Sequence, residues 1–237
     1  MRAKPGWWWP LALIPFLATL SGCEIFAPFY VAAMMMGYDT RRDPAFTFPE
    51  DAKRIAVISY ADSDTLIEMG HVDHELNETL SRTLFQEWDT GKNEAPLEAL
   101  TKKKVKPQVI KSSKVARWQD EHEDWRSLQP AEMGRELKAD YVIYVEIAKC
   151  SIYETGSKVL YHGQAEVTIT VVRVENEEIA FGPETMSIEY PRGRPIPVSN
   201  EIPPLKFRRE FIRRMAQQVS WLFIPHESGD EFSKDPF

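Results

Sequence analysis

The side chains that come closest to a metal-binding pattern stand at the start of a segment with helical apolar spacing. His71 and His74 are three positions apart, so both would lie on one face of a helix, and imidazole is a common zinc ligand. Asp73 and Glu75 adjoin them, but no cysteine or third histidine is near. Acidic side chains at the start of a helix interact favourably with its dipole. We therefore interpret the cluster as a solvated helix N-terminus and predict no metal site.

Local motifs for nucleophilic or phosphate chemistry are absent. The sequence has no glycine-rich phosphate loop, no Gly-x-Ser-x-Gly turn, no His-Glu-x-x-His helix and no Cys-x-x-Cys pair. Cys150 follows the apolar run 141–148, which favours a small buried strand residue over a nucleophile. We predict that the chain is not an enzyme and uses no cofactor. Catalytic residues that converge only in space are the open alternative.

Residues 1–22 have the pattern of a secretory signal peptide. Two basic residues precede the apolar segment 7–20, which is shorter than the roughly 20 residues that a helix needs to span a bilayer. The cleaved segment would leave a mature chain that begins at Cys23.

The end of this signal resembles the lipobox of bacterial lipoproteins. Leu20, Ser21 and Gly22 place small residues before Cys23, as signal peptidase requires. The resemblance implies a diacylglycerol and an N-acyl chain on Cys23, and several chains together give stable anchoring. Glu24 follows the cysteine in place of the aspartate that resembles an inner-membrane retention signal. We therefore expect a location in the cell envelope, at the outer membrane and facing the periplasm.

A second group of charged residues lies on the last predicted helix, 205–223. Arg208, Arg209, Arg213 and Arg214 stand apart from its apolar stripe and form a possible basic contact face for anionic lipid head groups or an acidic partner. An ordinary solvated face is the favoured alternative. The net charge of the whole chain is −7, so we predict no nucleic-acid partner.

The elements that must position these residues begin with alternating strands and helices. A β-branched run predicts a strand at 54–60, and apolar residues at every fourth position predict a helix at 72–88. A weak edge strand is expected within 102–110, followed by short helices at 114–123 and 131–138.

Three long strands then follow in succession. Short turns separate 141–153, 159–174 and 178–190, which predicts antiparallel hairpins, and Gly163 is interpreted as the mark of a bulge. A proline-rich loop, 191–204, leads to the last helix. The fold class is therefore α/β (α+β), with a single mixed sheet that carries antiparallel hairpins and helices packed on it.

The chain has 237 residues, enough for one domain with a tether. We expect a signal peptide at 1–22, a lipidated N-terminus and linker at 23–53, an α/β domain at 54–224 and a disordered tail at 225–237.

Two stretches carry a family resemblance: Lys-Arg-Ile-Ala-Val-Ile at 53–58 and Met-Gly-Arg-Glu-Leu-Lys-Ala-Asp-Tyr-Val-Ile at 133–143. They resemble the domain shared by the amino-terminal part of the Tol-system protein B, the penicillin-binding-protein activator lipoproteins and the curli-secretion-channel lipoprotein. The order of elements over 53–223 agrees with that group. The resemblance implies an envelope accessory that binds other proteins and catalyses nothing. Because the hairpin turns here are short, we predict no pore of the curli-channel kind.

These observations together lead us to expect a cell-envelope lipoprotein that acts as an assembly or regulatory accessory through protein-protein contacts. The membrane would be reached through the lipid anchor, and the partners would be envelope proteins. A lipoprotein that binds a small ligand or an envelope polymer is the alternative, and an unrecognised hydrolase comes after it.

Overall fold

The structure is a computed structural model that describes residues 41–90, 107–199 and 201–227. The chain divides into two compact units, Met1–Arg41 and Arg42–Phe237. The predicted signal peptide, its lipidation site Cys23 and the part of the predicted tail beyond residue 227 lie outside the described residues. In the described part of the chain, no helix is long and apolar enough to cross a bilayer.

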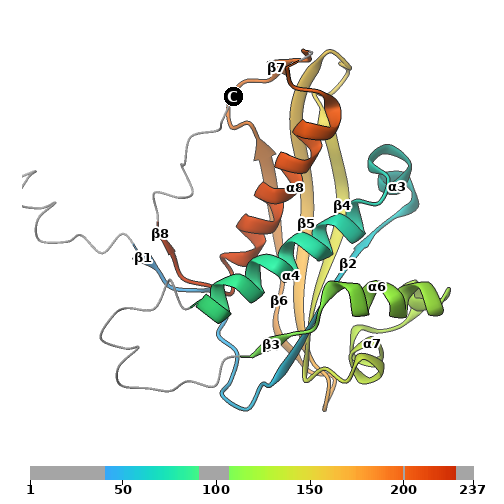
Figure 1. Cartoon of the computed structure of the whole chain (residues 1–237), viewed down its shortest axis with the longest axis vertical. Helices are drawn as coiled ribbons and strands as arrows, with labels where there is room; N and C mark the ends of the chain where they lie inside the picture. Colours follow the sequence, from blue (N-terminus) through green and yellow to red (C-terminus); the bar gives the residue numbers. More distant parts are fainter. Residues whose placement is uncertain (1–40, 91–106, 200, 228–237) are drawn as a thin grey trace, which may run out of the picture. The chain divides into compact units, whose positions relative to one another are not determined.

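A six-stranded mixed sheet is the centre of the second unit (Figure 1). The strand order is β3-β2-β4-β5-β6, and β7 pairs with β5. β2 is parallel to both β3 and β4, whereas β5 is antiparallel to β4 and β6. The strands are β2 (Arg54–Ala61), β3 (Gln108–Val109), β4 (Tyr141–Tyr153), β5 (Leu160–Arg173), β6 (Ile179–Tyr190) and β7 (Ile196–Pro197). The predicted fold class and the two long hairpins are confirmed. Two short strands, β1 (Arg41–Arg42) and β8 (His226–Glu227), lie outside this sheet.

Helices cover both faces of the sheet. The helical elements are α3 (Ser63–Met69), α4 (Val72–Thr90), α6 (Ser112–Glu121), the 3-10 turn η3 (Trp125–Ser127), α7 (Pro130–Leu137) and α8 (Pro204–Ser220). Buried residues of α4 and α8 share a core with Ile55 and Val57 of β2, whereas α6, η3 and α7 share a second core with Ala56 and Ile58. Successive side chains of a strand point to opposite faces, so β2 is buried on both sides.

The helix α8 lies close to β5 because the strand carries a glycine opposite an aromatic ring. A Cβ atom on Gly163 would come within 2.7 Å of two ring atoms of Phe211. The pairing of β4 with β5 also shifts here, since Ser151 pairs with Gln164 but Tyr153 pairs with Tyr161. One extra residue of β5 is thus accommodated next to Gly163, and the predicted bulge is confirmed.

The segment before β2 is part of the folded unit, which differs from the linker predicted up to residue 53. The ring centroid of Phe48 lies 5.7 Å from that of Trp88, 5.5 Å from that of Tyr141 and 5.9 Å from that of Phe223. The amide N–H of Phe46 donates to the carbonyl oxygen of Leu222 at 2.9 Å. Two aromatic side chains among prolines and charges were too weak a pattern to indicate this packing.

Helix α3 was not predicted because its seven residues are too few to display a helical period. Its one local signal is the cap, where the Asp62 carboxylate accepts a hydrogen bond from the amide of Thr65 at 2.8 Å. That contact holds the pKa of Asp62 below its usual value.

Replacing the half-buried Phe48 before β2 tests whether this segment belongs to the domain. We expect Phe48→Ala to lower the free energy of unfolding by about 2–3 kcal/mol. This is less than the effect of Phe→Ala at a fully buried position, because the Phe48 ring is only half-buried. Phe85→Ala is the matched control, because Phe85 is half exposed on α4, and it should change stability by less than about 0.5 kcal/mol. Chemical denaturation measures both. Equal effects would contradict the packing of Phe48.

Candidate binding site

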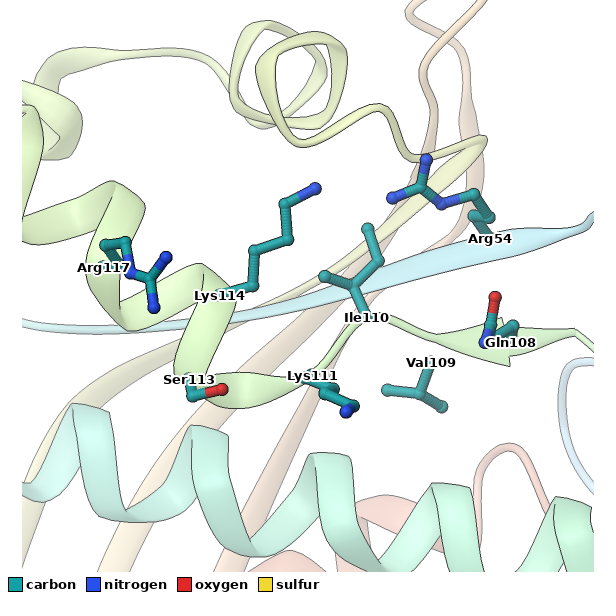
Figure 2. A pocket seen from close by; sticks show the side chains of 8 residues that line it. All are labelled: Arg54, Gln108, Val109, Ile110, Lys111, Ser113, Lys114 and Arg117. Atoms are coloured by element: carbon teal, nitrogen blue, oxygen red, sulfur yellow. The ribbon is translucent and has the colours of Figure 1, made fainter.

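A basic pocket lies where β3 ends and α6 begins, beside the first residue of β2 (Figure 2). Its volume is about 350 Å³, at the lower end of the range for small-ligand sites. The residues that line it are Arg54, Gln108, Val109, Ile110, Lys111, Ser113, Lys114 and Arg117. Four of these eight are cationic and none is acidic. The pocket is thus suited to an anionic group.

Backbone pairing at the sheet edge places these residues. The amide of Gln108 donates to the carbonyl oxygen of Lys53 at 2.8 Å, and the amide of Ile110 donates to that of Ile55 at 2.8 Å. The chain then turns into α6, which buries Val115 and Trp118 in the second core. Because these two positions face inward, the side chains at 111, 114 and 117 lie on the exposed side of the helix start.

Two of the cations meet at the last carbonyl group of α7. The Arg54 guanidinium donates to the carbonyl oxygen of Leu137 at 3.3 Å, and the Lys114 ammonium donates to the same oxygen at 3.5 Å. Figure 2 shows these two side chains directed toward one another over Ile110, with Arg117 farther along α6. Cations at the C-terminal carbonyls of a helix interact favourably with its dipole. This arrangement holds two positive charges side by side at the pocket.

The pocket cations have no carboxylate partners among the described residues. The ion pairs found in that part of the chain join other residues, and none includes Arg54, Lys111, Lys114 or Arg117. This site was not predicted from the sequence. The signal was present as three basic residues at three-residue spacing over 111–117, but Arg54 joins them only through the folding of the sheet.

The predicted basic contact face on α8 is distributed over different environments. Arg208 forms an ion pair with Glu75 of α4 at 2.9 Å, and its side chain is only 18% exposed. Arg214 is 11% exposed, lies 3.8 Å from Glu210 and stands over the ring of Tyr190. Both side chains therefore help to pack α8 against its neighbours.

The other two arginines of this face are exposed. Arg213 forms an ion pair with Glu210 on the same helix, and this contact raises the pKa of Arg213 and lowers that of Glu210. Arg209 donates to the carbonyl oxygen of Leu205 at 3.4 Å. A contact role for the four arginines stays a prediction. Arg209 could take this role with the least rearrangement of its present contacts.

His71 and His74 are not part of a metal cluster in the described residues. The rings of His71 and His74 lie 6.1 Å apart between centroids. His122 stacks on Trp118, and its Nε2 lies 3.1 Å from Glu136.

Cys150 is a buried free thiol in β4, where burial raises its pKa to about 12. A thiol with this pKa carries almost no thiolate at neutral pH, so it is a poor nucleophile. The interpretation of Cys150 as a small buried strand residue agrees with this position.

The interpretation of Asp73 as part of a solvated helix start is wrong, and a second buried ionisable side chain, His162, was not predicted from the sequence. Asp73 at the start of α4 is 2% exposed and pairs with Arg126 of η3 at 3.0 Å. His162 of β5 lies 2.6 Å from Glu154 through Nδ1. The first pair joins distant segments of the chain, and the second joins the two sides of a turn. Only the fold could therefore reveal them.

Comparison with known proteins gives structural matches alone, since no family model and no curated protein matches the chain. Protein XCC0632 from Xanthomonas campestris matches with 10% identity and a TM-score of 0.43, over 80% of this chain and 90% of that one. Lipoprotein GNA1162 from Neisseria meningitidis matches with 12% identity and a TM-score of 0.32, over 71% of this chain and 98% of that one.

TolB from Acinetobacter baumannii also matches, with 12% identity and a TM-score of 0.28. The match covers 73% of this chain and 27% of TolB. A bacterial lipoprotein and a TolB protein are thus among the solved structures that this chain is similar to.

A pair of single substitutions on α8 separates packing arginines from exposed ones. We expect Arg208→Gln to lower the free energy of unfolding by about 1–2 kcal/mol, because it leaves a partly buried Glu75 without its cation. Arg209→Gln should be neutral within about 0.5 kcal/mol. Thermal and chemical denaturation of both variants checks this, and a larger loss from Arg209→Gln would reverse the assignment.

Proposed function

We propose that this chain is a lipid-anchored accessory of the bacterial cell envelope that acts through contacts with other envelope proteins. The anchor rests on Leu20, Ser21, Gly22 and Cys23 in the sequence. A diacylglycerol and an N-acyl chain on Cys23 would hold the domain at a membrane. The proposed place is the outer membrane, with the domain facing the periplasm.

The observation that carries the contact role is a group of exposed apolar side chains at one end of the domain. Val159 is 70% exposed, Val198 38% and Leu205 68%. The amide of Val198 donates to the carbonyl oxygen of Val159 at 2.9 Å. Figure 1 places β7 and the start of α8 beside the tip of the β4–β5 hairpin. We call Val159, Val198 and Leu205 the hairpin-end surface.

A protein partner fits this surface better than a lipid layer does. The neighbouring exposed residues Lys158, Glu201 and Lys206 carry both signs of charge. Protein interfaces combine an apolar centre with a polar rim, whereas a surface that lies on anionic lipid is enriched in cations. The mixed rim therefore supports a protein contact.

A second candidate function, the binding of a small ligand, is favoured by the basic pocket. Catalysis has less support, because among the described residues that line the pocket Ser113 is the only one with a hydroxyl side chain, and none is a histidine or carboxylate that could act as a general base.

The anchor is tested in the native host by comparing the chain with Cys23→Ala. We expect the unaltered chain to sediment with membranes and its mature N-terminus to carry the mass of a lipidated Cys23. Cys23→Ala should lose that mass and leave the membrane fraction. An unmodified soluble product from the unaltered chain would contradict the anchor.

The contact surface is tested by placing a photo-crosslinking amino acid at single positions of the membrane-bound chain. Positions 159 and 205 should give a discrete protein adduct at a yield several times that of positions 67 and 85. Ile67 and Phe85 are matched controls, since they are 85% and 50% exposed on other elements. Equal yields at all four positions would contradict a specific contact at the hairpin-end surface.

A further inference from the structure

We infer that the basic pocket between β3 and α6 is a binding site for a phosphate group. This inference goes beyond the accessory role, because the pocket is formed by residues that are not part of the hairpin-end surface. The ligand class is a compact molecule or head group that bears a doubly charged phosphate.

The charge distribution gives the first reason. The whole chain carries a net charge of −7, yet the described residues that line this pocket include four cations and no acidic residue. Like charges that gather without carboxylate partners repel one another and destabilise the fold locally. A bound anion would relieve that repulsion. A basic patch that contacted only water would not need a concave surface.

The free hydrogen-bond donors give the second reason. Arg54 and Lys114 contact the neutral carbonyl oxygen of Leu137, but an arginine has five N–H donors and a lysine three. Donors therefore remain on both groups, and Ser113 and the exposed Arg117 also line the pocket. Phosphate oxygens accept several charge-assisted hydrogen bonds at once, and arginine binds them with two parallel bonds.

The charge and size of the ligand give the third reason. A phosphate monoester carries up to two negative charges near neutral pH, so it matches several cations better than a single carboxylate does. A volume of about 350 Å³ accommodates a small phosphorylated molecule or a lipid head group. Either source presents the same phosphate chemistry.

The test uses the full lipidated chain in neutral detergent micelles, titrated with inorganic pyrophosphate in a calorimeter. The pocket variant is Lys111→Gln/Arg117→Gln, because these two side chains are exposed and form no ion pair in the described residues. Arg82→Gln/Lys149→Gln removes two exposed cations elsewhere and is the matched control. We expect the pocket variant to weaken binding by more than about tenfold and the control by less than about twofold.

A competition experiment identifies the source of the phosphate. Short-chain phosphatidic acid mixed into the micelles should displace pyrophosphate if a lipid head group fits, and short-chain phosphatidylcholine should not. Binding of pyrophosphate without displacement by phosphatidic acid supports a soluble phosphorylated ligand.

Three outcomes would overturn the inference: no binding of either phosphate probe by the unaltered chain, equal weakening in both double variants, or unchanged binding in a pocket variant whose thermal unfolding matches the unaltered chain. Each of these leaves photo-crosslinking at positions 159 and 205 unaffected. Failure of the phosphate site can therefore be distinguished from failure of the accessory role.

Discussion

The parallel pairing of β2 with β4 is the constraint on which the rest of the domain depends. The carboxylate of Asp140 accepts hydrogen bonds from the amides of Lys53 and Arg54, each at 2.8 Å. This contact aligns the first residues of both strands, so Ile55 pairs with Tyr141 and the register continues to Ala61. Because β2 is buried on both faces, a slip of one residue would exchange the side chains of the two cores. The Asp140 contact thus accounts for an acidic residue directly before an apolar strand.

Both proposed surfaces are consequences of this central pairing. At the start of β2, the short strand β3 pairs with Arg54 and Ile55 and turns directly into α6, which brings three basic side chains of the helix start to Arg54. At the far end of the long hairpin, β7 pairs with Leu160 and Tyr161 and places exposed apolar residues at the tip. The domain therefore offers a cationic site and an apolar site on different elements.

The buried ionisable groups of the domain serve its stability. Asp73 with Arg126 and Arg208 with Glu75 each join α4 to another element. A buried charge without its partner is costly, so these pairs favour one arrangement of the helices over the sheet. Cys150 carries no such buried charge, because burial raises its pKa to about 12 and keeps the thiol neutral. The arginines of α8 looked like one surface in the sequence, but two of the four are used in this packing.

The sequence by itself determined the strong periodic elements: the helix from residue 72, the stripe of α8 and the three long strands within one residue at their ends. Apolar spacing at period 3.6 or 2 is a local property, so one chain segment is enough to reveal it. Only the tertiary structure decided that Phe48 packs against the core, that Arg208 meets Glu75 and that Arg54 joins the basic start of α6. Those contacts join residues far apart in the chain, and their positions follow from strand pairing and helix packing, which no local pattern contains.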